Sequence, residues 1–221
     1  MNNGDHRARG IGWPVLIGLT LAGLTLLAAF ALMQLKSRYA SAAALPIAGP
    51  IADFTLTNQD GCAVSLADLR GHVWVADIIF TRCAGPCPVM TRQMKALQDA
   101  LPSDSPTKLV TLTTDADYDT PPVLKTYAGR FGADPRRWIF LTGTKREIAN
   151  LAIDSLKLTA IAKKPEERNT PEDLFVHSTI FVVADKQGRL RGVFETEGEG
   201  IEWASAKEQI LAAVRRLERE T

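Results

Sequence analysis

The feature that most constrains this chain is a long apolar stretch close to its N-terminus. No residue from 10 to 35 carries a charge, and Trp13–Leu35 is predominantly apolar. A helix of about 20 such residues crosses the roughly 30 Å hydrocarbon core of a bilayer. We therefore expect a cytoplasmic tail over 1–12, a transmembrane anchor over 13–35 and an Ala-rich, Pro-containing linker over 36–49.

A cleaved signal peptide is the alternative interpretation of the same stretch. Small-residue cleavage patterns occur within 40–44, but the apolar region of a signal peptide spans only about 7–15 residues. Charge does not decide the orientation, because Arg7 and Arg9 lie on one side of the stretch and Lys36 and Arg38 on the other. A short leading tail and a large trailing domain favour export of the domain.

Composition limits what the rest of the chain can do. Of the 221 residues 46% are hydrophobic, which is enough for an ordinary core, and the net charge is +1. No basic stripe with interleaved aromatics occurs, so we expect no nucleic-acid partner. Three cysteines are too few for a disulfide scaffold in a domain of this size.

Strands alternate with helices through residues 50–221, which we expect to form one folded domain. The predicted elements are strands at 73–80, 109–112 and 138–141, helices at 88–100, 121–131 and 145–156, and then a hairpin at 178–194 and a helix at 203–217. Alternation predicts a mostly parallel sheet. With the closing hairpin, the order is that of a thioredoxin-like α/β fold, a central mixed sheet flanked by helices. The charged insertion at 160–173 is expected to be a flexible loop.

The two thiols of Cys83 and Cys87 are placed by this pattern between a buried strand and a helix start. With Gly85 and Pro86 between them, they can share one metal ion or close one disulfide. The helix N-terminus behind Cys87 is expected to favour its thiolate. Soft thiolates select copper(I) or zinc, so the sequence indicates copper or redox chemistry.

The chain has three histidines, and their positions separate them. His6 lies in the charged tail, and His72 is expected to be an exposed residue at a strand entry. His177 directly precedes the strand at 178–183, and in a thioredoxin-type sheet the loop before that strand faces the cysteine loop. His177 is therefore the candidate third ligand; a surface imidazole with no ligand role is the alternative.

Five segments together resemble the Sco/SenC family over about residues 51–193. They are FTRCAGPCP at 80–88, DADYDTP at 115–121, VLKTYA followed by FG at 123–132, LTG at 141–143 and HST at 177–179. Members of this family are membrane-anchored, thioredoxin-like proteins. They deliver copper to the dinuclear copper centre of cytochrome c oxidase or reduce the cysteines of that centre.

The resemblance implies specific site residues and partners for this chain. Cys83, Cys87 and His177 become the ligands of copper, as Cu(I) or Cu(II), and the two cysteines become a redox-active pair able to form a disulfide. The partners implied are the copper-site subunit of cytochrome c oxidase, a thioredoxin-like reductant and another copper chaperone. The chain would cross the bacterial inner membrane once, with its soluble domain in the periplasm.

Two departures from the family pattern stand out. Val176 precedes His177 where family members often carry Asp, so a carboxylate that orients the histidine must come from elsewhere, and Asp115 is the candidate. Cys62 follows Gly61 in a predicted turn. It is either an inert surface thiol or a third redox partner, and we favour the inert thiol because the turn supplies no evident feature that lowers its pKa.

Two function classes follow from these residues. The first is a metallochaperone, which is not an enzyme, and the second is a thiol-disulfide oxidoreductase in which Cys83 and Cys87 cycle between dithiol and disulfide. His177 discriminates between them, because thiol exchange needs no imidazole ligand. A thiol peroxidase is a weaker third candidate, since Phe80 stands where that mechanism needs a threonine.

Overall fold

The structure is a computed structural model that describes residues 12–42, 45–168 and 174–220. Its contacts divide the chain into two compact units, residues 1–44 and 45–221, and each is described by itself. Most of the predicted cytoplasmic tail, with His6, lies outside the described residues.

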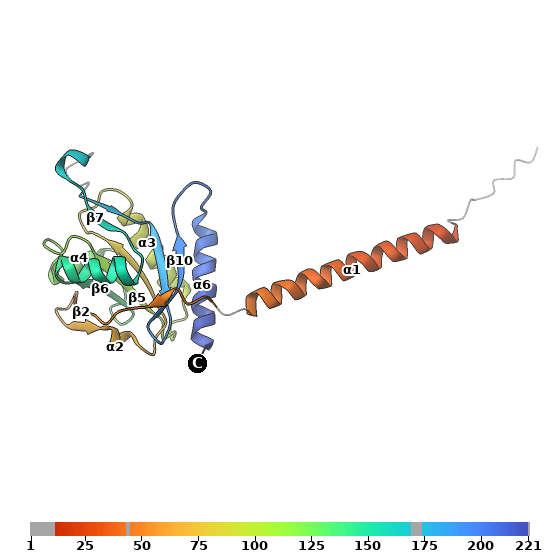
Figure 1. Ribbon diagram of the computed structural model, residues 1–221, viewed down its shortest axis with the longest axis horizontal. Coiled ribbons are helices and arrows are strands. Elements are labelled where there is room, and N and C mark those ends of the chain that lie inside the picture. Colours follow the sequence, from red (N-terminus) through yellow and green to blue (C-terminus); the bar gives the residue numbers. More distant parts are fainter. Residues whose placement is uncertain (1–11, 43–44, 169–173, 221) are drawn as a thin grey trace, which may run out of the picture. The chain divides into compact units, whose positions relative to one another are not determined.

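The described part of the N-terminal unit is a single helix, α1 (Trp13–Ala42) (Figure 1). Its first 22 residues, Trp13–Gln34, include an 18-residue window with a mean hydropathy of 2.4, and they are long and apolar enough to cross a membrane. At 1.5 Å per residue they span about 33 Å. The apolar part of the helix agrees with the predicted span, but the helix itself continues past Leu35 to Ala42.

The second unit is built on one sheet of eight strands within the described residues, in the order β1-β10-β9-β4-β5-β6-β2-β3. The strands are β1 (Gly49–Pro50), β2 (Thr55–Asn58), β3 (Ala63–Ser65), β4 (Trp74–Ile79), β5 (Lys108–Thr113), β6 (Trp138–Thr142), β9 (Ile180–Ala184) and β10 (Arg189–Glu195). The three central strands β4, β5 and β6 are parallel, and all other pairs are antiparallel.

The prediction of a mostly parallel sheet is therefore wrong, although the mixed sheet of a thioredoxin-like fold is confirmed. Helical crossovers produce parallel neighbours, and only β4, β5 and β6 are joined in this way. The hairpin β2–β3 joins the β6 edge, and the hairpin β9–β10 joins β4 antiparallel. The sequence predicted the hairpin at 178–194, but it did not predict which strands the two hairpins would join.

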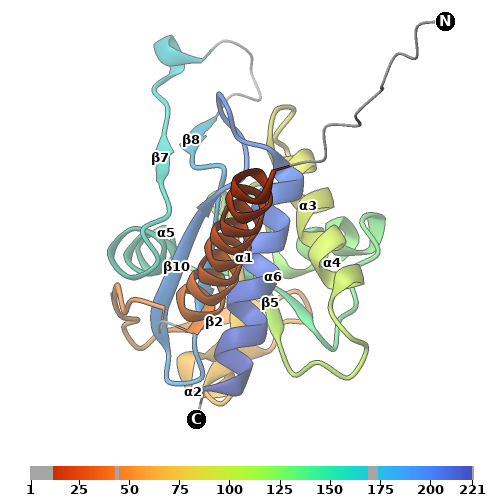
Figure 2. The ribbon, with the colours of Figure 1, turned by 90° about the vertical axis from the view of Figure 1, so that its right-hand side faces the viewer.

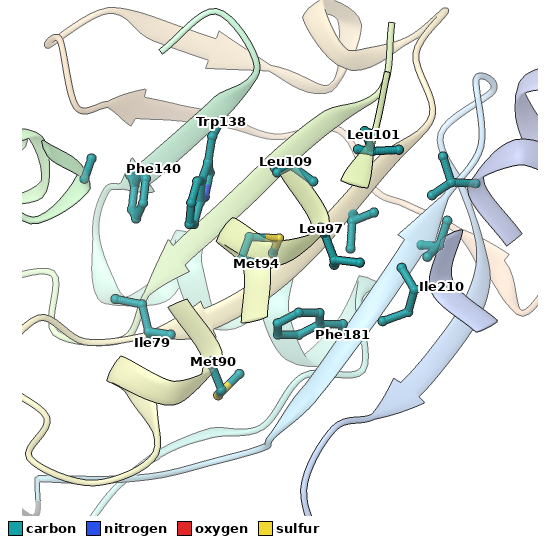
Figure 3. Close-up of a cluster of buried hydrophobic side chains, with 14 of the residues drawn as sticks. Ile79, Met90, Met94, Leu97, Leu101, Leu109, Trp138, Phe140, Phe181 and Ile210 are labelled. Atoms are coloured by element: carbon teal, nitrogen blue, oxygen red, sulfur yellow. The ribbon is translucent and has the colours of Figure 1, made fainter. Parts of the chain in front are cut away.

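Helices cover both faces of the sheet. They are α2 (Leu66–Leu69), α3 (Cys87–Ala100), α4 (Pro121–Arg130), α5 (Lys145–Ala149), a π-helical turn η1 (Asn150–Ser155) and α6 (Trp203–Arg219). One core lies between the sheet and α3, α4 and α6, where Met94, Leu97 and Ile210 surround Phe181 (Figure 3). The second core packs residues of α2, α5 and η1 against the opposite face. Two buried layers hold the central strand β4 rigidly between them.

A small second sheet replaces part of the loop expected over 160–173. β7 (Ala160–Ala162) pairs antiparallel with β8 (Phe175–His177), and Ala160 lies opposite His177. A 3₁₀ turn, η2 (Pro165–Glu167), follows β7. Residues 169–173 lie outside the described part of the chain. The insertion thus forms a strand that pairs with the backbone of the candidate ligand His177.

An ion cluster joins the two ends of the second unit. The buried Arg191 of β10 donates to Asp185 at 2.8 Å and to Glu220, just after α6, at 2.7 Å. It also donates to the carbonyl oxygens of Leu45, at 2.7 Å, and Pro46, at 3.3 Å. This cluster holds the point at which the domain begins against its last residues.

Candidate metal and redox site

The cysteine loop leaves the carboxyl end of the buried strand β4. Pro86 precedes the first residue of α3, Cys87, and Pro88 is the second. Proline suits this place because its fixed φ is helical and the first turn needs no amide donor. The loop therefore ends with Cys87 already inside the first helical turn, with its side chain in the core.

The two sulfurs lie in hydrogen-bond contact, Cys83 half-buried and Cys87 buried. The amide of Phe80 donates to Cys87 Sγ at 3.4 Å, and the amide of Gly85 donates to Cys83 Sγ at 3.4 Å. Both amides stabilise negative charge on sulfur. The pair is therefore prepared for two thiolates in contact with one metal ion, or for one disulfide.

The expectation that the helix N-terminus favours the Cys87 thiolate is wrong for the metal-free dithiol. Burial raises the pKa of the Cys87 thiol far above its ordinary value, and the hydrogen bond with Cys83 and the charges of Cys83 and Asp77 add to the increase. The Phe80 amide opposes this only in part. Desolvation of the thiolate is the largest cause of the increase.

A hydrogen-bonded layer lies behind the pair. Thr91 donates its hydroxyl to the Cys87 carbonyl at 2.8 Å, so Tyr127, whose hydroxyl lies 2.8 Å from the same Thr91 oxygen, is the donor to it. Burial raises the pKa of Tyr127, and the charges of Cys87 and Asp77 add to the shift. Asp77 is wholly buried in β4. These groups fix the helical side of the site.

The other side of the loop is held by Asp119, which the sequence analysis did not single out. Its carboxylate accepts the Thr81 amide at 3.0 Å, the Thr81 hydroxyl and the Thr113 hydroxyl. Burial raises the pKa of Asp119, and the Thr113 and Thr81 hydrogen bonds partly oppose that shift. The only sequence signal for this role was its position in the segment 115–121.

Asp115, the candidate for orienting His177, pairs with the cysteine loop. Arg82 donates to its carboxylate through Nε at 3.1 Å and Nη2 at 2.5 Å, and the guanidinium lies 4.0 Å from the centre of the Tyr118 ring. The residue next to Cys83 is thus fixed by an ion pair and a cation–π contact. An open groove of about 460 Å³, lined in part by Arg82, Tyr118 and Arg130, lies beside it.

The backbone of His177 lies at the same end of the sheet as the cysteine loop. β9 runs antiparallel to β4 with Val182 opposite Ala76, so this register places Ile180 level with Ile78. Two residues, Ser178 and Thr179, separate His177 from the start of β9. The side chain of His177 lies outside the described residues, and among those described no three His, Cys, Asp or Glu side chains gather into a metal-binding group.

The remaining histidine and cysteine lie at the other end of the sheet. His72 precedes β4, and its Nδ1 is 2.9 Å from the Pro106 carbonyl. Cys62 is exposed in the turn between β2 and β3. That turn points toward the start of β6, because Gln59 bonds the carbonyl of Trp138 at 3.3 Å. Neither residue can join the Cys83–Cys87 pair without a change of fold.

Comparison with known sequences and structures identifies the family. A sequence profile described as SCO1/SenC matches residues 47–212. The chain belongs to the SCO1/SenC family. Its sequence is 37% identical over 147 residues to the SCO1 protein homolog of Bacillus subtilis, covering 66% of this chain and 73% of the relative.

Solved structures of Sco proteins share the fold. One of them is BsSco, a member of the Sco family of cytochrome c oxidase assembly proteins, and a disulfide switch was identified in BsSco. It superposes on this protein with a TM-score of 0.66 and 29% identity, over 81% of this chain and all of that one. The copper-bound ScoI of Bradyrhizobium japonicum gives a TM-score of 0.60 and 23% identity, over 75% of this chain and 98% of that one. The second unit of this SCO1/SenC protein therefore has the thioredoxin-like fold of the Sco structures.

Proposed function

We propose that this protein is a membrane-anchored copper chaperone that delivers copper to the dinuclear centre of cytochrome c oxidase during assembly. The observation that carries the proposal is the contact between the Cys83 and Cys87 thiols at the end of β4, beside the start of β9 that follows His177. Membership in the SCO1/SenC family and the copper bound by a relative of the same fold support it.

Copper binding has a physical basis in this loop. The raised pKa of the Cys87 thiol means that this thiol holds its proton in the metal-free protein. Binding of a copper ion displaces the Cys87 proton, and the charge of the metal balances the thiolate that forms. We propose the imidazole of His177 as the third ligand, which makes the site suitable for both Cu(I) and Cu(II).

Release to a client requires that one ligand be reachable from outside. Cys83 is half-buried whereas Cys87 is buried. We therefore propose that a client thiolate replaces Cys83 first, and that Cys87 leaves the metal last. Three ligands leave one coordination position for the incoming sulfur.

A thiol-disulfide oxidoreductase is the second candidate, favoured by the same difference in exposure. In this reaction the Cys83 thiolate attacks a client disulfide, and Cys87 then attacks the mixed disulfide. Two electrons pass to the client, which leaves as a dithiol, and the protein keeps a Cys83–Cys87 disulfide. The disulfide switch of BsSco supports this alternative.

The proposed location rests on α1. We propose that α1 is retained as a single-pass anchor in the bacterial inner membrane, with residues 1–12 in the cytoplasm and the domain from residue 50 onward in the periplasm. The apolar segment Trp13–Gln34 supports the anchor. The proposed partners are the copper-site subunit of cytochrome c oxidase, a thioredoxin-like reductant and another copper chaperone.

The test is a copper titration of the reduced full-length protein in detergent with Cu(I) and Cu(II). We expect one tight equivalent, which weakens in Cys83→Ser and Cys87→Ser for both ions and in His177→Ala chiefly for Cu(II). The matched controls His72→Ala and Cys62→Ser change the same residue types at the opposite end of the sheet. They should bind as the parent does.

Two results would redirect the proposal. Unchanged Cu(II) affinity in His177→Ala would remove the histidine from the ligand set. A reduced parent that binds no tight copper but forms a reversible disulfide would place the protein among the oxidoreductases.

A further inference from the structure

The second strand of the closing hairpin, β10, has an open outer edge. On its inner side it pairs with β9 from Leu190 to Glu195. On its outer side, within the described residues, β1 covers only Arg189 and Leu190. Figure 2 shows β10 and α6 side by side. A strand edge with unpaired amides and carbonyls is a template for another extended chain.

The direction of the backbone groups can be assigned from the ladder. The amide of Thr196 donates to the Thr179 carbonyl at 2.9 Å, so Thr196 faces β9. Because alternate residues face the same neighbour in an antiparallel pair, Phe194 also faces β9, whereas Val193 and Glu195 direct their amides and carbonyls outward. Both outward residues are exposed, Val193 by 47%.

Within the described residues, the chain that precedes β1 makes no backbone hydrogen bond with these groups. The Ala48 amide still donates to the Leu190 carbonyl at 2.8 Å. Upstream, Pro46 has no amide hydrogen, and the carbonyls of Leu45 and Pro46 accept hydrogen bonds from Arg191. A register irregularity between Leu190 and Gly192 also separates the covered part of β10 from the open part.

A groove of about 530 Å³ runs beside the open edge. Residues of β10, of the start of α6 and of the loop between them line this groove. They include the apolar Val193, Phe194 and Ile201 and the carboxylates of Glu195 and Glu202. The lining offers an apolar floor and two carboxylates, with no Lys or Arg. It therefore suits an extended segment that carries an apolar side chain next to a basic one.

The open edge lies at the functional end of the sheet. Glu195 is opposite Ile180, which the register of β9 and β4 places level with Ile78, one residue before β4 ends. A chain added to β10 would lie three strand spacings, about 15 Å, from β4. A partner held there can place its own metal ligands at the cysteine loop.

We propose that the outer edge of β10 at Val193–Glu195 docks an extended, basic and apolar segment of the protein that receives the copper. This inference rests on the proposed function for the identity of the partner. Backbone pairing would give the affinity, and Glu195 and Glu202 would select a basic side chain.

The experiment uses the full-length protein in nanodiscs and, as probe, the copper-free soluble domain of the copper-site subunit of cytochrome c oxidase from the same organism. Hydrogen exchange is measured over Arg191–Thr196 with and without the probe, and affinity is measured by surface plasmon resonance. Val193→Pro removes one outward amide and leaves the β9 ladder intact. Glu195→Lys reverses the charge of the groove, and Glu199→Lys changes an exposed loop glutamate outside its lining.

We expect added protection of the outward Val193 and Glu195 amides in the complex and at least tenfold weaker binding for Val193→Pro and Glu195→Lys, with Glu199→Lys unchanged. A complex that leaves these amides unprotected, parent-like binding of both edge variants, or no complex at all would overturn the proposal. So would protection that rises with the protein's own concentration, because a second copy would then occupy the edge. Copper titration of the same samples tests the proposed function separately.

Discussion

Replacing Asp119 with alanine is expected to loosen the cysteine loop from the sheet. The Asp119 carboxylate accepts the amide and hydroxyl of Thr81, at the start of the loop, and the hydroxyl of Thr113, at the end of β5. Asp119 and Thr113 are buried, and Thr81 is half-buried. The alanine variant leaves three donors without their acceptor. Two of them belong to Thr81, which lies two residues before Cys83.

The size of the effect follows from those donors. A buried donor left unsatisfied costs about 1–3 kcal/mol, and water can reach the half-buried Thr81 in part. The desolvation that raises the pKa of Asp119 is relieved by the substitution, which offsets part of the loss. We expect the free energy of unfolding to fall by about 3 kcal/mol, out of the roughly 5–15 kcal/mol typical of a domain. Asp119→Asn keeps one acceptor oxygen and should cost about 1 kcal/mol.

The assay is urea unfolding of the full-length protein in detergent, followed by the fluorescence of the buried Trp74 and Trp138. Asp53→Ala is the matched control, because its carboxylate is 86% exposed and forms an ion pair with the exposed Arg70 at 3.3 Å. It should unfold within about 1 kcal/mol of the parent. If Asp119→Ala matched this control, the idea that Asp119 anchors the loop would be refuted. Weakened copper affinity at unchanged stoichiometry should accompany the destabilisation.

Three further predictions test other parts of the molecule. Burial would raise the pKa of Asp185, but hydrogen bonds from its arginine partners outweigh burial and lower it. The stability that the Asp185 carboxylate contributes is therefore complete above about pH 4 and is lost as the pH falls through the lowered pKa. The unfolding free energies of the parent and of Asp185→Asn, measured in urea titrations, should converge in acid. Met94→Ala should lower the unfolding free energy by about 2–5 kcal/mol in urea titrations, and a neutral effect would contradict its core role. In a Cys83→Ser/Cys87→Ser background, a membrane-impermeant maleimide should label the exposed Cys62 in spheroplasts, whereas labelling only after lysis would place the domain in the cytoplasm.

Local signals in the sequence predicted the elements of this fold closely. The predicted strand at 73–80 is β4 (Trp74–Ile79), the predicted helix at 88–100 is α3 (Cys87–Ala100), and the predicted helix at 203–217 is α6 (Trp203–Arg219). Apolar periodicity reports which face of an element is buried, and proline marks where a helix begins. These signals also placed the cysteine pair between a strand and a helix, and they marked the apolar segment of α1.

Long-range pairing lay beyond those signals. The sequence did not show that most neighbouring strands of the sheet are antiparallel, that an inserted strand pairs with His177, or that Asp119 holds the cysteine loop. Each depends on residues distant in the chain and on the register between strands. Asp115 shows the same limit, because its partner Arg82 is 33 positions away and was not foreseen.

The sequence by itself determined the apolar span, the order of strands and helices, and the presence of two thiols at a strand–helix junction, because each follows from residues close together in the chain. Only the tertiary structure decided that Cys87 is buried deeply enough to keep its proton, that His72 and Cys62 lie at the wrong end of the sheet, and that β10 keeps an open edge. Burial and strand register arise when distant segments pack together, and no local pattern encodes them.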